Sequence, residues 1–100
     1  MREDRQRLDK WLWFARFAKT RSLAAKLVAS GFVRVNGQRT DSAAKALAVG
    51  DVVTLALAQA TLVVRVESLG ERRGPAQEAR QLYADLSPTD GALVRNGDSR

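Results

Sequence analysis

Apolar residues change their spacing near Gly31, and this change decides which kind of fold the chain is able to form. Before it, they recur at the i, i+3, i+4 and i+7 positions of one helical face: Leu8, Trp11, Leu12 and Ala15. After it, Val33 and Val35 alternate with residues of the opposite face, as in a strand. Helices followed by strands in one short chain predict an α+β domain.

A second short helix is predicted between Thr20 and Gly31. Thr20 is a good N-cap residue, and Gly31 stands where a C′ glycine ends a helix. A narrow apolar stripe lies between them: Ala24, Leu27 and Val28. Residues 17–19 are then the turn between the two helices.

The strands that follow are separated by clear turn signals. Asn36-Gly37 is the strongest short hairpin signal, because a type I′ turn needs positive φ at both central positions. Gly50-Asp51 marks a second turn. The same reasoning predicts three further strands, over residues 38–40, 52–57 and 62–67, with a turn over 58–61.

One more short helix is predicted near the C-terminus, after the break at Gly74-Pro75. Four residues there have helical spacing: Ala79, Leu82, Tyr83 and Leu86. The predicted order is ααββββα, with two short helices packed on a small, mostly antiparallel sheet. We expect one domain over residues 7–86, a flexible segment over 1–6 and a disordered tail over 87–100.

The charge is concentrated in the first half of the chain. The net charge is +6, with 17 basic and 11 acidic residues. Residues 1–45 hold eleven basic and four acidic residues, whereas residues 46–100 hold six and seven, so the first half carries +7 and the second −1. A charge that only keeps a protein soluble has no need of such segregation. A polyanionic partner is therefore predicted.

Cysteine and histidine are both absent, which removes thiolate sites, the commonest general base and the commonest metal ligand, although carboxylates remain. The glutamates at 67, 71 and 78 lack the spacing of a catalytic pair. We expect a protein that is not an enzyme, with no catalytic residues, no metal, no cofactor and no small-molecule substrate. No apolar run approaches the roughly 20 residues that cross a bilayer, so a cytoplasmic protein with no membrane partner is expected.

Basic residues are predicted to gather on the two helices, away from the apolar faces. They lie on the helices or at the start of the second one: Lys10, Arg16, Lys19, Arg21 and Lys26. Free N–H groups at the second helix's N-terminus, next to Thr20, favour phosphate. Arg34 and Arg39 flank the hairpin turn and are interpreted equally well as phosphate contacts or as solvated strand residues.

The aromatic residues of the first helix have different predicted roles. Trp11 lies on the apolar face and is assigned to the core. Trp13 and Phe17 lie opposite that face on a helical wheel. Trp13 is interpreted either as a platform for an unpaired base or as a side chain covered by the C-terminal helix, and the second interpretation is favoured.

Residues 7–57 resemble the S-four RNA-binding module in both sequence and spacing. The matching motifs are Arg7-Leu8-Asp9, Thr20-Arg21-Ser22, Gly31-x-Val33-x-Val35-Asn36-Gly37 and Gly50-Asp51. The segments RLDKWLWFARFAKTR (7–21) and ERRGPAQEARQLY (71–83) are similar to the bacterial heat-shock protein 15 family. The resemblance implies a function in binding ribosomal RNA of the large subunit, in heat shock or in rescue of stalled ribosomes, with tRNA as a further partner.

The resemblance also implies an RNA-binding face. Carried over position by position, it comprises Arg7, Lys10, Lys19, Thr20, Arg21, Lys26 and Asn36, with Arg34 and Lys45 as less certain members. Family members continue into a long basic C-terminal extension, whereas residues 87–100 here are not strongly basic, so contacts made by that extension are not expected.

Three other functions are compatible with parts of the sequence. Two basic helices joined by a short turn are also typical of DNA-binding helix-turn-helix proteins. S-four modules accompany some RNA-modifying enzymes, and the apolar C-terminal helix is a candidate protein-docking surface. A monomer is the expected state.

Overall fold

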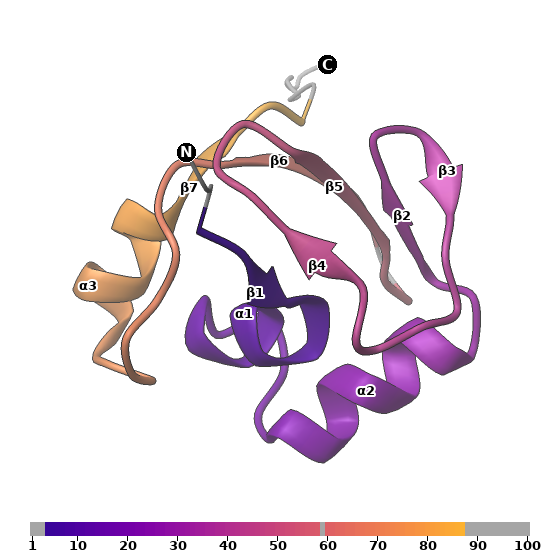
Figure 1. Ribbon diagram of the computed structural model, residues 1–100, viewed down its shortest axis with the longest axis horizontal. Coiled ribbons are helices and arrows are strands. Elements are labelled where there is room, and N and C mark those ends of the chain that lie inside the picture. Colours follow the sequence, from indigo (N-terminus) through magenta and orange to yellow (C-terminus); the bar gives the residue numbers. More distant parts are fainter. Residues whose placement is uncertain (1–3, 59, 88–100) are drawn as a thin grey trace.

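The computed structural model describes residues 4–58 and 60–87, which form two helices packed beneath an antiparallel sheet (Figure 1). Helices α1 (Leu8–Phe14) and α2 (Arg21–Ala29) come first. The main sheet has the order β3-β2-β5-β6-β7. Its strands are β2 (Val33–Val35), β3 (Gln38–Arg39), β5 (Val52–Ala56), β6 (Thr61–Val66) and β7 (Tyr83–Asp85). This confirms the predicted α+β class.

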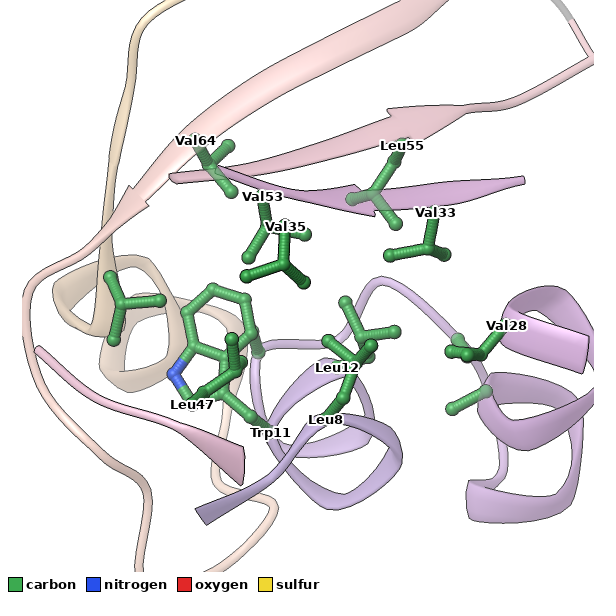
Figure 2. Packing of buried hydrophobic residues seen from close by; sticks show 14 residues of the cluster. Leu8, Trp11, Leu12, Val28, Val33, Val35, Leu47, Val53, Leu55 and Val64 are labelled. Carbon is green, nitrogen blue, oxygen red and sulfur yellow. The ribbon is translucent and has the colours of Figure 1, made fainter. Parts of the chain in front are cut away.

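The core lies between the two helices and the inner face of the sheet (Figure 2). The predicted apolar face of α1 is confirmed, since Leu8, Trp11 and Leu12 are completely buried. Alternate residues of the sheet, such as Val53 and Val64, point toward them. The Trp11 indole Nε1 donates a hydrogen bond to the Ser68 carbonyl oxygen over 3.0 Å, which satisfies its buried polar atom.

Helix α1 ends one residue before Ala15, and the chain then turns sharply. Arg16 has φ +67°, a left-handed conformation that stops the helix. Phe17 was predicted to lie opposite the core, but it packs inward instead, 6.0 Å from the Trp11 ring and 4.8 Å from the Tyr83 ring. The helical-wheel projection was wrong for Phe17 because the chain is no longer helical there.

Both predicted ends of α2 are confirmed. The Thr20 hydroxyl oxygen accepts a hydrogen bond from the Leu23 N–H over 3.0 Å, which is the geometry of an N-cap. Gly31 has φ +86°. A Cβ at Gly31 would meet the guanidinium group at the end of the exposed Arg39 side chain, which is free to move aside, so the positive φ is the reason that this position favours glycine.

The predicted hairpin is present, with φ of +54° at Asn36 and +81° at Gly37. Strand β2 pairs with both β3 and β5, and β5 pairs with β6, all antiparallel. The two longer strands lie within one residue of their predicted bounds.

Two short strands were not predicted. Strand β1 (Gln6–Arg7) pairs with β4 (Ala46–Leu47) in a separate antiparallel sheet, which Figure 1 shows beside α1. Gln6, which was expected in the flexible segment, is held by two hydrogen bonds between its side-chain amide and the Gly70 backbone, of 2.8 and 3.0 Å. Two-residue strands carry too little alternation to be read from a sequence.

The C-terminal helix is shorter than predicted. Helix α3 (Ala76–Ala79) and a 3₁₀ turn (Arg80–Leu82) lead directly into β7. Tyr83 is therefore a strand residue, paired with Val66 of β6. This pairing satisfies backbone groups along an edge of β6 that a helix would have left open. Ser87, expected in the tail, accepts a hydrogen bond from the Val63 N–H over 2.8 Å, and residues 88–100 lie outside the described residues.

Candidate nucleic-acid interface

A buried carboxylate joins the two basic helices. Asp9, in the first turn of α1, keeps only 5% of its side-chain surface exposed. Arg7 donates to both of its oxygens, from Nε and Nη2, each over 3.1 Å. The Nε of Arg21, the first residue of α2, lies 3.6 Å from Asp9 Oδ2. In the sequence, Asp9 stood out only as part of the Arg7-Leu8-Asp9 motif, so this role was missed.

The charge balance of this cluster remains positive. Burial raises the pKa of Asp9, but the hydrogen bond from Arg7 and the charges of Arg21 and Arg7 outweigh that effect, so the pKa lies below its ordinary value. One carboxylate therefore faces two guanidinium groups. The side chains of Arg7 and Arg21 are 50% and 43% exposed, and the carboxylate holds them in place without removing them from solvent.

Lys10 directly follows Asp9 in α1, and the backbone of Lys45 lies at the start of the same helix. The Lys10 Nζ is 5.6 Å from the centre of the Phe14 ring, a cation–π contact that places the side chain along α1. The Lys45 carbonyl oxygen accepts a hydrogen bond from the Leu8 N–H over 2.8 Å, so its loop lies at the start of α1. The Lys45 side chain is exposed.

A second cationic group lies along α2. Lys19 and Lys26 line the same surface groove, although seven positions separate them in the sequence. Thr20 caps the helix between Lys19 and Arg21, so the two cationic groups meet at the start of α2. All of these side chains except the partly buried Lys10 are exposed.

Three of the predicted site residues make their contacts outside these two cationic groups. The Arg16 Nη1 donates to the Gly74 carbonyl oxygen over 2.9 Å, beside the C-terminal segment. The Asn36 amide bridges to β5, since its Oδ1 accepts from the Val52 N–H over 2.9 Å and its Nδ2 donates to Asp51 Oδ1 over 3.2 Å. Arg34 is exposed between two buried valines, so it points from the face of the sheet opposite the helices.

Trp13 is partly buried against the core, and its ring stacks on Phe14 with 5.3 Å between centroids. The favoured packing interpretation is confirmed, but the predicted cover is not. Tyr83 packs instead on Trp11, with 6.5 Å between ring centroids, and on Phe17. Tyr83 contacts these two rings and not Trp13 because α1 ends early and because Tyr83 lies in a strand.

Within the part of the chain that the structure describes, no three acidic, histidine or cysteine side chains are grouped so as to hold a metal ion. None of the helices in residues 4–58 and 60–87 has the length and hydropathy needed to cross a membrane. The cationic surface is thus the feature of the described chain that most clearly suggests a function.

These elements define a protein of the S4 class, in which two short helices carry a cationic surface on a small sheet. The S4 domain model matches residues 6–53, which confirms the predicted S-four module. The chain belongs to the heat shock protein 15 family, as the following relatives show.

Heat shock protein 15 of Escherichia coli strain K12 is 43% identical over 81 residues, which are 81% of this chain and 60% of that protein. The chain thus spans less than two thirds of the length of this relative. A solved structure described as trimeric Vibrio cholerae heat shock protein 15 is 42% identical and superposes with a TM-score of 0.78 over 84% of each chain. The small ribosomal subunit protein uS4 of Xanthobacter autotrophicus is 42% identical over 72 residues, 35% of its length.

Proposed function

We propose that this chain binds structured RNA through α1 and α2, and that its target is ribosomal RNA. The observation that carries the proposal is the convergence of Arg7 and Arg21 on the buried Asp9, which presents two ordered guanidinium groups from different helices. Seven of the ten predicted residues form the proposed surface: Arg7, Lys10, Lys19, Thr20, Arg21, Lys26 and Lys45.

The physics of RNA recognition supports this choice of ligand. A-form RNA has a deep, narrow major groove that hides its base edges, so folded RNA is bound mainly through its backbone and its shape. Arginine forks match phosphate oxygens in pairs, and guanidinium groups that are already held by a carboxylate lose little freedom on binding. One of the chain's relatives, uS4, is a protein of the small ribosomal subunit.

The finer assignment is the large ribosomal subunit, in a heat-shock or stalled-ribosome rescue role and in the cytoplasm, with tRNA as a further partner. It is supported by membership of the heat shock protein 15 family. The surface is formed within one chain, so we propose that a monomer is sufficient for binding, although the Vibrio cholerae relative is described as trimeric.

The test is co-sedimentation of the purified chain with separated large and small ribosomal subunits over a series of salt concentrations. We expect it to sediment with the large subunit and to be released steeply as salt rises. Sedimentation with the small subunit alone would contradict the large-subunit assignment. Retention after nuclease removal of the RNA would contradict RNA binding and favour a protein contact.

Two basic helices are also typical of DNA-binding helix-turn-helix proteins, and this alternative function is tested directly. The chain is offered a ribosomal RNA fragment and a DNA duplex of equal length in one competition assay at physiological salt. We expect preference for the RNA, because the arginines track a backbone whose spacing differs between the A and B forms. Preference for duplex DNA would replace the proposed function.

A further inference from the structure

A groove runs along α2 and is lined by Lys19 and Lys26 of the second cationic group, but its apolar residues have no role in the contacts described above. It has a volume of about 420 Å³. The residues that line it and carry the argument are Phe17, Lys19, Leu23, Lys26, Leu27 and Phe32. We call it the α2 groove.

The α2 groove exposes an unusual amount of apolar surface. In the described chain, four large apolar side chains are exposed, and two of them, Leu23 (45%) and Phe32 (49%), line this one groove. Single exposed apolar residues are common on protein surfaces, but neighbouring ones that line a hollow indicate a binding site. The α2 groove is therefore a candidate binding site whose ligand has not yet been assigned.

The backbone of Phe32 and the ring of Phe17 are both anchored at the α2 groove. The Phe32 N–H donates to the Leu27 carbonyl oxygen over 3.2 Å, and its own carbonyl oxygen accepts from the Ala56 N–H over 2.8 Å. Phe17 is fixed from behind by the Tyr83 ring. A flat ligand that stacks here meets the Phe17 ring and the Phe32 backbone already in position, which limits the conformational entropy lost.

The positive charges around the α2 groove favour a ligand that carries negative charge. Its charged lining residues are Lys19 and Lys26, and none of the described residues that line it is acidic. A ligand that fits is flat and apolar in one part and anionic in another. Two copies of this chain meeting groove to groove would bring four lysines together, which disfavours a symmetric self-contact.

We propose that the α2 groove holds one unstacked nucleotide of the bound RNA, with its base on the Phe32 ring and its phosphate between Lys19 and Lys26. The inference rests on the proposed function and makes it more specific. RNA loops and bulges offer bases that are already unstacked, and such bases stack on aromatic side chains. The chain would then recognise a paired segment interrupted by a bulge or loop.

Three RNA duplexes test this proposal, with the full chain as the protein. One carries a single bulged uridine, the second has an abasic residue in place of that uridine, and the third is fully paired. We expect the bulged duplex to bind more tightly than the abasic one by roughly 5- to 100-fold. Phe32→Ala should remove this preference and leave affinity for the fully paired duplex unchanged.

Two control variants separate stacking from loss of the fold. Phe32→Tyr keeps a ring at the position and should keep the preference. Val49→Ala shortens another exposed apolar side chain, 59% exposed and outside the groove, and should also keep it. Circular dichroism melting of each variant checks that it is folded.

Other results would overturn the inference in distinguishable ways. Equal affinity for the bulged and abasic duplexes, or a preference that survives Phe32→Ala, removes the nucleotide from the groove and leaves RNA binding intact. If no duplex binds even at low salt, the proposed function itself fails. If sedimentation equilibrium shows an oligomer that Phe32→Ala dissociates, the groove is a contact between copies.

Discussion

The Nε of Arg21 lies 3.6 Å from the carboxylate of Asp9, and this contact ties the first residue of α2 to the first turn of α1. Twelve positions separate the two residues, and the turn between the helices brings them together. The same carboxylate also holds Arg7. The carboxylate thus links the two helices and holds the guanidinium groups of two cations.

Replacing Asp9 by asparagine should destabilise the fold by about 1–3 kcal/mol at neutral pH, because charge-assisted hydrogen bonds become neutral ones in a buried position. The pKa of Asp9 in the folded chain is below its ordinary 3.8. Its stabilisation is therefore present above that value and is lost as the pH falls through the lowered pKa. Urea denaturation between pH 7 and about pH 2 measures this.

Asp41→Asn is the matched control, since Asp41 is exposed and its loss should change stability by less than about 0.5 kcal/mol. The difference between wild type and Asp9→Asn should shrink as the solution is acidified. A difference that stays constant over the whole pH range would show that the charge of Asp9 does not stabilise the fold.

Neutralising Lys19 and Lys26 together, each to glutamine, should weaken RNA binding with little effect on folding. Two fewer phosphate contacts should reduce the slope of log affinity against log salt by about 2. Filter binding at several salt concentrations gives the slope. These lysines test the surface more cleanly than Arg21, whose removal also breaks the pair with Asp9.

The control for the lysine variant is Arg65→Gln with Arg72→Gln, which removes the same charge elsewhere. Arg65 and Arg72 each pair with a glutamate at the surface, over 2.7 Å in both cases. Surface pairs of this kind contribute about 0–1 kcal/mol, so this variant should remain folded. If both double variants lose the same affinity, net charge and not the proposed surface governs binding.

Thr20→Ala should cost about 1 kcal/mol of stability, because the Leu23 N–H loses the hydroxyl oxygen that caps α2. Thr20→Ser keeps that acceptor and should be nearly neutral. Urea denaturation of the two variants measures the difference. Equal stability of the alanine and serine variants would show that the cap contributes nothing.

Asn36→Gly should destabilise the chain by about 1–2 kcal/mol without lowering the RNA affinity of the folded protein. Glycine adopts the φ of +54° easily, so the loss reflects the amide bonds to Val52 and Asp51. Urea denaturation and filter binding are the two measurements. A folded variant with weaker RNA binding would restore Asn36 to the interface, as the family resemblance predicted.

Local signals were enough to predict much of this fold. The spacing of Leu8 and Trp11, the cap at Thr20 and the positive-φ pair at Asn36 and Gly37 each depend on near neighbours, and the structure confirms them. The pairing of β1 with β4 and the strand at Tyr83 depend on partners that are distant in the sequence, such as Leu47 for Gln6 and Val66 for Tyr83. Pairing to a sheet edge overrode the helical spacing there.

The candidate site, like the fold, was determined partly by local sequence and partly by tertiary contacts. The sequence by itself determined that the cations gather in the first half and lie on or near two helices, because charge and helical periodicity are local properties. Only the tertiary structure decided which of them share a surface. Asp9 forms an ion pair with Arg21 of the other helix, and the Asn36 side chain donates a hydrogen bond to Asp51. Such partners are distant in the sequence, so packing and not spacing determines them.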